Sequence, residues 1–477
     1  MRIKLLWLIV AFLCFYAYRD WFKALCGLIL LMAVIEHPDI PKTVGGIQGL
    51  NPWNLVFLCT FTAWLMGRRA QGLVWDMPKH VTWMLLAYLG VVVAGFIRMI
   101  ADSDNIYLGL HQETIASLIS EYFVNTIKWV VPGLMLYDGC RTRKRMTWGL
   151  AAVLGIYVLL ALQLVRWMPP GTALSGTELT LRSRKIIENE IGFHAVNMSM
   201  ILSGASWAML AMMPLARKRW HKIGIGFLFV LIAYGQAVTA GRMGYVTWAM
   251  IGLILCVIRW RKMLLLVPVV PVLVTIFLPG VAERFTEGMG SNSRMVGEAV
   301  DDYAVTSGRT LIWPYVIDKI EESPIVGYGR QAMVRTGVST FLLEELGEGF
   351  PHPHNAYLEM LFDNGVIGFI LVMPFYVMIV WYSVLLFRDK RNPMFAAVGG
   401  MSCSLVLALL IAAMGSQTFY PREGAVGMWC AIGMMLRMYK ARQAMPALAR
   451  QAQMARVREA RMRHQAMMSP ELGRAGQ

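Results

Sequence analysis

The stretch that decides the fold class is LNPWNLVFLCTFTAWLMGRR, residues 50–69. Its apolar part carries no charged side chain, and Arg68 and Arg69 follow directly. A membrane-spanning helix needs about 20 mostly apolar residues. A basic cluster just beyond such a helix is typical of its cytoplasmic end. We therefore expect residues 50–66 to cross a membrane and to end in the cytoplasm.

The composition of the whole chain supports this interpretation. Of its 477 residues, 57% are hydrophobic and only 16% are charged, and the mean hydropathy is +0.53. The core of a soluble domain needs no such apolar excess. The chain is therefore predicted to be an all-α polytopic membrane protein.

Further apolar runs recur along the chain. We expect them to span the membrane near residues 81–100, 118–137, 146–168, 193–214, 223–239, 243–258, 263–278, 363–387, 394–414 and 424–438. Arg19 and Asp20 interrupt residues 5–35, which we interpret as one crossing with a broken or interfacial portion. No small-residue cleavage site follows the basic start, so this segment is expected to be a retained helix. The total is about twelve transmembrane helices.

The net charge of +16 is gathered in clusters that follow every second predicted span. These clusters are Arg68–Arg69, Arg141 to Arg145, Arg217 to Arg219, Arg259 to Lys262, Arg388 to Arg391, and a long tail from Arg437. Such spacing indicates orientation, with both termini in the cytoplasm. No separate basic domain is present, so no nucleic-acid partner is expected.

This topology divides the chain into four parts. They are N-terminal transmembrane helices in residues 1–278, one large outer loop in residues 279–356, C-terminal transmembrane helices in residues 357–438, and a basic cytoplasmic tail in residues 439–477. The tail is expected to form a helix that is attracted to anionic membrane lipids, with a protein partner as the weaker alternative. Its arginines are Arg450, Arg456, Arg458, Arg461 and Arg463.

The large outer loop contains one predicted helix. Ser307 is a candidate N-cap, and the apolar positions that follow have helical spacing. They are Leu311, Ile312, Tyr315, Val316 and Ile320. This helix either packs as an ordinary lid on the spans or takes part in the function.

Arginines on the predicted outer face are the first candidates for chemistry. Arg182, Arg184 and Lys185 precede the span near Phe193, Arg242 occupies a very short turn, and Arg309 begins the loop helix. The guanidinium fork matches phosphate oxygens, and several arginines together can hold a diphosphate without a metal. The alternative is that each arginine pairs with a nearby carboxylate or meets lipid headgroups. Those carboxylates are Glu188, Glu190, Glu283, Asp301 and Asp302.

Two histidines stand just before the apolar run of residues 363–387, in PHPHNAYLE, residues 351–359. In an extended segment His352 and His354 point to the same side, as a pair of metal ligands would. No third ligand lies at a plausible spacing, so we predict no metal. The seven cysteines lie in apolar runs or beside basic clusters, and they imply neither a disulfide framework nor a metal site. A neutral imidazole is also a usual general base, and histidines at headgroup level are the plain alternative.

Three stretches, taken in order, resemble the O-antigen ligase and polymerase superfamily of bacterial envelope glycosyltransferases. TAGRMGYVTW, residues 239–248, is similar to the arginine turn of that family. SGRTLIWPYVIDKIEESPIVGYGR, residues 307–330, is similar to its loop segment, and HNAYLEMLFDNGVIG, residues 354–368, to its His-Asn-x-Tyr-Leu signature. The combination carries the resemblance, which is closest to the O-antigen ligases and covers roughly residues 180 to 390.

The resemblance implies an activity. Members of the family transfer a glycan from undecaprenyl diphosphate to an acceptor hydroxyl at the periplasmic face of the inner membrane. They invert the anomeric carbon and need no metal, nucleotide or other cofactor. The expected partners are therefore this lipid-linked donor, a lipid A core sugar or growing glycan as acceptor, and membrane lipids.

The same resemblance assigns roles to residues. His354 is expected to be the base on the acceptor hydroxyl, and Arg242 and Arg184 to stabilise the departing diphosphate. The other predicted substrate contacts are Arg182, Arg309, His352, Asn355 and Tyr357. Whether His352 assists His354 or replaces it stays open at this point.

Other functions remain in competition. The three stretches do not separate a ligase from a polymerase. A transporter of an anion or a polyprenyl lipid could use the same arginines without a base, although no internal repeat and few charges inside the spans support one. The grouping of arginines on one face argues against a purely structural membrane scaffold.

Overall fold

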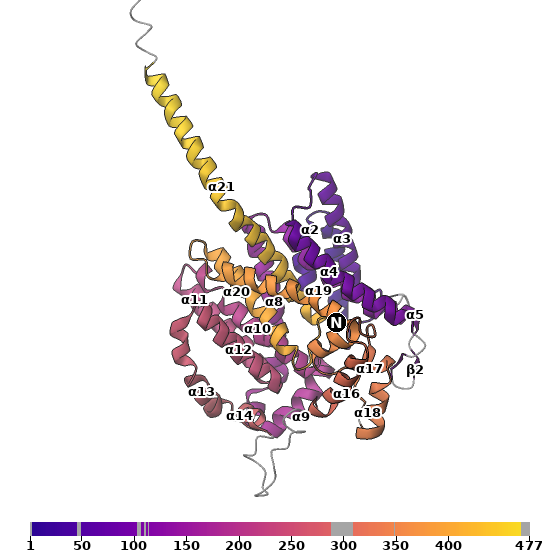
Figure 1. The fold of residues 1–477 in the computed structure, drawn as a ribbon. Helices are drawn as coiled ribbons and strands as arrows, with labels where there is room; N and C mark the ends of the chain where they lie inside the picture. The colour runs from indigo at the N-terminus through magenta and orange to yellow at the C-terminus, as the bar shows by residue number, and fades with distance from the viewer. Residues whose placement is uncertain are drawn as a thin grey trace, which may run out of the picture.

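The chain folds into a bundle of helices in a computed structural model that describes residues 2–44, 49–102, 106–108, 111–112, 114–287, 309–347 and 349–468 (Figure 1). The N-terminal helices are α1 (Arg2–Ala17), α2 (Trp21–Leu31), α3 (Pro52–Ala70), α4 (Lys79–Ile100), α5 (Ile115–Leu118), α6 (Asn125–Lys128), α7 (Val131–Gly139) and α8 (Arg143–Trp167). The central helices are α9 (Gly176–Ile186), α10 (Ala195–Leu210), α11 (Arg219–Ala237), α12 (Arg242–Ile258), α13 (Val269–Phe277) and α14 (Pro279–Thr286). The last are α16 (Arg309–Glu322), α17 (Ala332–Arg335), α18 (Val338–Leu346), α19 (Ala356–Phe387), α20 (Pro393–Ala412) and α21 (Val426–Met468).

Short elements connect these helices. They are the antiparallel pair β1 (Tyr107–Leu108) and β2 (His111–Gln112), the π-helices η2 (Ile119–Val124) and η4 (Ile187–Ile191), and the 3₁₀-helices η3 (Pro170–Leu174), η5 (Met213–Leu215), η6 (Arg261–Leu266) and η7 (Glu423–Ala425). The predicted all-helical class is confirmed, since within the described residues the strands are confined to this small pair.

Five described helical segments are long and apolar enough to cross a membrane. They are α4, α8, α10 with η5, α19 and α20, and α13 with α14 makes a sixth if that pair, bent by 112°, is one span. α1, α2 and α12 are apolar but shorter. Every apolar run expected from the sequence contains helix, although this finding does not reach the predicted number of about twelve spans.

Two of the expected spans are broken rather than continuous. Residues 118–137 are divided among η2, α6 and α7, because Pro132 lacks the N–H that would continue the helix from α6. Residues 263–278 are divided between η6 and α13, which follows Pro268, and Pro279 starts the bent helix α14. Asp20 caps α2, so the N-terminal segment forms two helices that break where Arg19 and Asp20 were expected to interrupt it.

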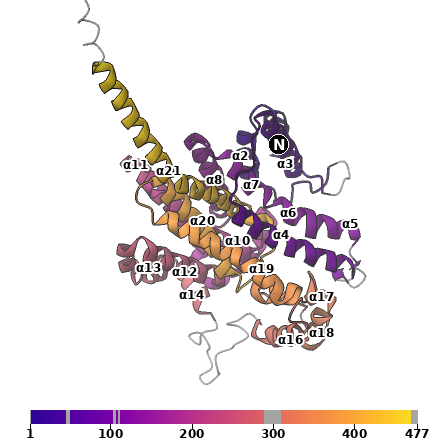
Figure 2. The same cartoon turned by 45° about the horizontal axis from the view of Figure 1, so that its top comes forward.

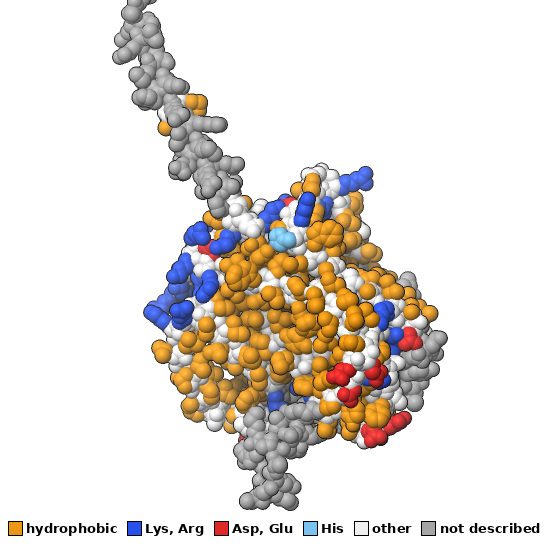
Figure 3. Space-filling view, in the orientation of Figure 1, with side chains coloured by type: hydrophobic (Ala, Val, Ile, Leu, Met, Phe, Trp, Pro, Cys, Tyr) orange, Lys and Arg blue, Asp and Glu red, His pale blue; other side chains and the backbone are white. Residues whose placement is uncertain are grey.

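The predicted cytoplasmic clusters meet at one end of the bundle. Asp76 forms ion pairs with Arg141, Arg437 and Lys440, at 3.5, 2.9 and 2.7 Å. Likewise, Asp389 pairs with Arg442 at 2.9 Å, and its carbonyl accepts from Arg259 at 3.2 Å. α21 projects from this end, whereas α9, α14 and α16 lie at the other end (Figure 1). On the visible face, hydrophobic side chains cover the zone between them (Figure 3).

The outer end carries a small second core. Ile312 and Val316 of α16 pack with Met333, Leu342 and Phe362, and α16, α17 and α18 lie together beyond the start of α19 in both ribbon views (Figures 1 and 2). The predicted loop helix is therefore present. The predicted cap Ser307 and the carboxylates Asp301 and Asp302 lie outside the described residues.

A break in α19 is bridged by hydrogen bonds from the unit that contains α16, α17 and α18, which we call the outer unit. At Gly365 the backbone leaves the helix, with φ 61° and ψ −169°. Tyr328 and Gly329 donate their N–H groups to the carbonyls of Phe362 and Asp363, and beyond the break Val366 and Ile367 donate to Pro324 and Ile325. Residues 324–329 thus satisfy the backbone groups that the kink would leave open, and they fix the outer unit onto α19.

Candidate functional site

The histidine segment is tied to two helices. The backbone N–H of Ala356 donates to the carbonyl of Ala413 at 2.7 Å, and the Tyr357 hydroxyl donates to the carbonyl of Leu410 at 2.7 Å. From the other side, the indole N–H of Trp313 in α16 donates to the carbonyl of Pro353 at 3.0 Å. Residues 353–357 are therefore held between α20 and α16.

Asn355 and Tyr357 have structural roles in this segment. The Asn355 side chain caps α19 by accepting from the N–H groups of Tyr357 and Leu358, at 3.0 and 3.4 Å. The Tyr357 hydroxyl is used by α20, and its ring packs on Phe419. Their predicted contact with substrate stays a prediction.

The two histidines lie against one another. His354 has a left-handed backbone, with φ 52°, and its N–H donates to Nδ1 of His352 at 3.2 Å. The two ring centroids are 4.2 Å apart. A non-glycine residue with positive φ is held there only by its surroundings. His352 therefore fixes the direction in which His354 points.

Burial and nearby cations keep both imidazoles neutral. Burial lowers the pKa of His352 to about 4, helped by Arg422, His194 and Arg309. It lowers the pKa of His354 to about 3, helped by His352, Arg309 and His194. Both rings are therefore free to accept a proton at pH 7.

Arg309 lies near this pair, and Arg242 lies near Arg309. Arg309 is partly buried at the start of α16, and its pKa is lowered first by burial and then by the charge of Arg242. Arg242 in turn is under the charges of Arg284, Glu287 and Arg184. Arg184 thus acts on Arg242, Arg242 on Arg309, and Arg309 on His354.

The turn that carries Arg242 is set by close helix packing. A Cβ on Gly241 or Gly244 would lie 2.5 Å or 1.9 Å from atoms of Ser199 in α10. Ser199 also donates to the carbonyl of Gly241 at 3.2 Å. The start of α12 is therefore pressed onto α10, and Arg242 is half-buried and donates to the carbonyl of Glu287 at 3.1 Å.

Arg182 and Arg184 have different surroundings. Two residues apart on α9, their side chains point to different sides of the helix. Arg184 is among the charges that act on Arg242, whereas Arg182 donates to the carbonyl of Trp167 at 3.3 Å. The structure thus brings Arg184, and not Arg182, to the other arginines. Of the alternative partners, Glu283 accepts from the N–H of Gly176 at 2.8 Å, and within the described residues no carboxylate lies within ion-pair distance of Arg184 or Arg309.

Three further side chains, two arginines and one histidine, lie at this site and were missed in the sequence. Arg422 and His194 act on His352, and Arg284 acts on Arg242 and donates to the carbonyl of Ala240 at 3.3 Å. Arg422 and His194 lie in or beside segments already expected to face the same side, which was a usable signal. We call Arg184, Arg242, Arg309, Arg422, His194, His352 and His354 the arginine–histidine group.

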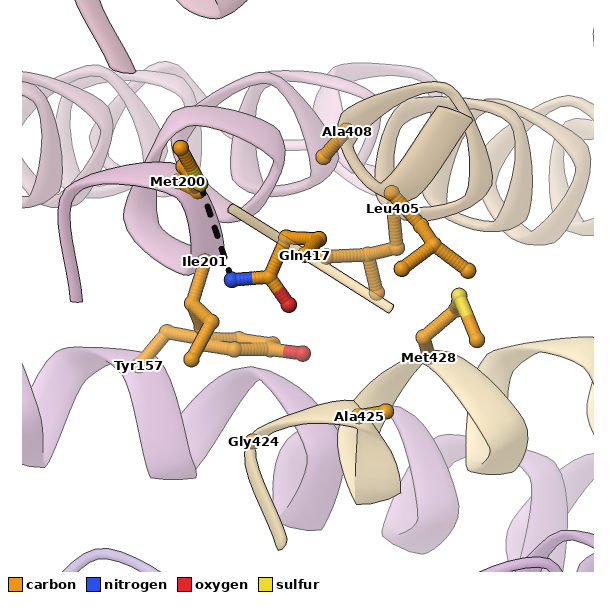
Figure 4. Close-up of a pocket in the computed structure, with 10 residues that line it drawn as sticks. Tyr157, Met200, Ile201, Leu405, Ala408, Gln417, Gly424, Ala425 and Met428 are labelled. Atoms are coloured by element: carbon orange, nitrogen blue, oxygen red, sulfur yellow. Dashed lines mark hydrogen bonds between the residues drawn. The ribbon is translucent and has the colours of Figure 1, made fainter. Parts of the chain in front are cut away.

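The loop that carries Arg422 is held by the half-buried amide of Gln417. Gln417 donates to the side-chain oxygen of Asn197 at 3.2 Å and to the Met200 sulfur at 3.6 Å, both in α10. Figure 4 shows Gln417 pointing into an apolar pocket lined by Tyr157, Ile201, Leu405 and Met428. The loop is therefore fixed to α10, whose N-cap residue is His194.

The site offers cations and imidazoles rather than metal ligands. Within the described residues, no group of three His, Cys, Asp or Glu side chains could hold a metal ion. Several neighbouring arginines suit a diphosphate, and a neutral imidazole near them suits a proton acceptor.

Comparison with known proteins shows which family the central part of the chain is similar to. Residues 227–373 match the family model described as O-antigen ligase. The resemblance to the O-antigen ligase superfamily is confirmed. The matched O-antigen ligase region includes Arg242, Arg309, His352 and His354, and the remaining members of the arginine–histidine group flank it.

Two curated relatives agree with this family. A Rickettsia conorii protein, provisionally named a polysaccharide ligase, is 24% identical over 181 residues, which cover 36% of this chain and 42% of that protein. A Rickettsia felis protein with the same provisional name is 24% identical over 180 residues, with the same coverage. The chain thus spans less than half the length of the curated relatives it matches. The match and the apolar helices indicate a membrane protein that is similar in its central part to polysaccharide ligases.

Proposed function

We propose that this O-antigen ligase-like chain transfers a glycan from undecaprenyl diphosphate to an acceptor hydroxyl. The acceptor is a lipid A core sugar, and the reaction takes place at the periplasmic face of the bacterial inner membrane. The proposed topology has about twelve spans, cytoplasmic termini and a periplasmic unit formed by α16, α17 and α18. The observation that carries the proposal is the convergence of Arg242, Arg309 and His354 from separate parts of the chain.

The proposed reaction is a single displacement. The acceptor oxygen attacks the anomeric carbon as His354 takes its proton, and the bond from that carbon to the diphosphate oxygen breaks on the opposite face. The electron pair leaves with the diphosphate. Arg184, Arg242 and Arg309 stabilise the charge that develops there. The configuration at the anomeric carbon is inverted, and no metal is required.

The low basicity of His354 in the free protein fits this scheme. Arg309 and His352 hold its pKa down beside the main effect of burial. A bound diphosphate would add negative charge next to Arg309 and Arg242 and cancel part of their field. The imidazole would therefore become a better base only when the donor is in place. His352 would act as a positioning residue, since its Nδ1 accepts from the His354 backbone.

The test is transfer by purified protein in vesicles that contain an undecaprenyl diphosphate-linked glycan and a lipid A core acceptor. A positioned base contributes about 100- to 10,000-fold in rate, so His354→Ala should lose most of the transfer. His80→Ala is the matched control, because His80 lies at the other end of the bundle and bonds to the Tyr382 hydroxyl. Wild-type transfer by His354→Ala would refute the proposal, and if Arg242→Ala alone lost function, a transporter would be favoured. Polymerised glycan in place of a capped core would identify a polymerase.

A further inference from the structure

A cleft lies on the periplasmic unit, outside the arginine–histidine group. It contains about 640 Å³ of open space between α16 and the α17–α18 segment. Its lining residues are Tyr315, Asp318, Lys319, Glu322, Thr336, Gly337, Val338 and Phe341. We call it the α16–α18 cleft. One side of α16 supplies Ile312 and Val316 to the second core, so its other side is left to form the cleft wall.

Two aromatic rings are exposed in this cleft. The centroids of Tyr315 and Phe341 are 5.3 Å apart, and the ring planes are inclined by 59°. Tyr315 is 38% and Phe341 is 42% exposed. Aromatic rings present flat apolar faces, and the C–H side of a sugar ring is a flat apolar surface of matching size. The pair is therefore a ready stacking platform for carbohydrate.

Polar groups surround the rings. Lys319 donates to both carboxylate oxygens of Glu322 at 2.8 Å, and the Tyr328 hydroxyl donates to the same carboxylate at 3.1 Å. Asp318 is exposed beside them, and the Thr336 hydroxyl lies across the cleft. Carboxylates and hydroxyls accept hydrogen bonds from sugar hydroxyls. The cleft therefore pairs apolar stacking with polar acceptors.

The charge around the cleft argues against an anionic occupant. Glu321, Glu344 and Glu345 are exposed on α16 and α18, and acidic side chains gather where these helices lie (Figure 3). Like charges would repel phosphate and anionic lipid headgroups. A diphosphate is thus directed to the arginines and the sugars to the acidic cleft.

The cleft is joined to the arginine–histidine group by α16 itself. Arg309 begins this helix, Trp313 holds the histidine segment, and Asp318 lines the cleft. At 1.5 Å per residue, Arg309 and Asp318 are about 14 Å apart along the helix. A glycan whose diphosphate lies at Arg309 can therefore continue along α16.

We propose that the α16–α18 cleft binds the carbohydrate chain of the lipid-linked donor and aligns it with the arginine–histidine group. This inference rests on the proposed function for the identity of its ligand. It adds a glycan subsite formed by Tyr315, Phe341, Asp318 and Thr336.

Binding of free glycan tests the cleft without using the reaction. The probe is polysaccharide released by mild acid from the lipid-linked glycan of the producing cells, so that it carries neither lipid nor diphosphate. The full-length protein in detergent is titrated by calorimetry. The double variant Tyr315→Ala, Phe341→Ala should bind about 10-fold more weakly, as expected when buried anchor rings are lost. Leu343→Ala is the control, because Leu343 is 52% exposed on the same helix as Phe341 but does not line the cleft.

The outcomes separate this inference from the proposed function. Equal affinity of the double variant and the wild type would overturn the cleft assignment, whatever the transfer assay gives. Tyr315→Trp keeps an aromatic ring and should retain affinity for the glycan. If Tyr315→Trp loses binding as the double alanine variant does, the substitutions have disturbed the structure rather than the stacking. That result would also contradict the cleft assignment. His354→Ala should bind free glycan normally. If it does, and wild-type protein transfers nothing, the proposed reaction fails while the glycan subsite stands.

Discussion

The indole N–H of Trp313 donates to the carbonyl of Pro353 at 3.0 Å, and this bond joins the helix that begins at Arg309 to the segment that contains His354. The proposed cation and the proposed base are thus linked through one side chain. Their relative position would depend on this bond more than on either residue's own backbone.

Trp313→Phe should therefore slow transfer without preventing insertion. A lost neutral hydrogen bond costs about 0.5–1.5 kcal/mol, which corresponds to about a 3- to 10-fold lower rate if it acts on the transition state. The vesicle assay should show the loss mainly in kcat, because the cleft and most of the arginines are unchanged. Trp83→Phe is the control, since Trp83 is 70% exposed on α4. Equal loss in the two variants would contradict a specific link.

The pH dependence of transfer should show the depressed pKa of His354. Burial lowers this pKa from its ordinary 6.5 to about 3, so the free protein keeps a neutral base well below pH 6. The value of kcat/KM, which reports the free enzyme, should stay level from pH 7 to about pH 5. A fall in kcat/KM centred near pH 6.5 would show a histidine with an ordinary pKa.

A second limb of the same profile tests the effect of the diphosphate. The value of kcat reports the enzyme–donor complex, in which added negative charge raises the pKa of His354. The acid limb of kcat should therefore lie at higher pH than that of kcat/KM. If His352 only positions His354, His352→Ala should lower the transfer rate. It should move the acid limbs of the kcat and kcat/KM profiles only slightly.

The lowered pKa of His354 also determines how the stability of the folded protein depends on pH. The unfolded chain binds a proton at His354 below about pH 6.5, whereas the folded chain does not until about pH 3. The folded protein should therefore lose stability as the pH falls between these values, and be unaffected above them. Thermal unfolding in detergent at pH 7 and pH 5 measures the difference, and His354→Ala should reduce it.

Gly365 should tolerate no side chain. Its φ of 61° and ψ of −169° lie in a region used almost only by glycine, and a non-glycine residue there costs about 1–3 kcal/mol. An added Cβ would also lie 2.3 Å from the carbonyl oxygen of Ile325. Gly365→Ala should lower the unfolding temperature and loosen the unit formed by α16, α17 and α18. Gly90→Ala is the matched control, since a Cβ on Gly90 meets nothing within 4 Å and alanine favours a helix.

Local sequence signals predicted the helices, and they suggested which residues to examine as a site. Apolar runs such as residues 81–100 and 394–414 correspond to α4 and α20, because hydrophobic length is a property of the segment itself. The sequence also indicated where the turn at Arg242 and the segment before α19 would lie. Short polar stretches between apolar runs are expected at the ends of a helical bundle. That these two segments and Arg309 all face the outer side of a membrane stays a prediction.

Contacts between segments far apart in the chain could not be predicted from the sequence. The Asn364-Gly365 dipeptide signals a break in α19, but no local pattern shows that residues 324–329 bond to it. Likewise, Arg422 enters the site because Gln417 is fixed to α10, a contact that depends on the packing of two helices. Arg182 and Arg184 were both expected at the substrate, although a separation of two residues, about half a helix turn, gives them different neighbours.

The different neighbours of Arg182 and Arg184 allow a direct comparison of their alanine variants. Arg184→Ala removes a charge that acts on Arg242, and loss of a hydrogen bond to a charged group lowers affinity or rate by about 10- to 100-fold. Arg182→Ala leaves the site's charge intact and removes a bond to the carbonyl of Trp167, so it should cost about 1 kcal/mol of stability and little transfer. The two variants have the same charge and lie on the same helix, which makes each the control for the other. Donor KM and transfer rate in vesicles, with unfolding temperature alongside, measure both effects. Should Arg182→Ala reduce transfer as much as Arg184→Ala, the diphosphate would have to reach further along α9 than Arg242 and Arg309 indicate.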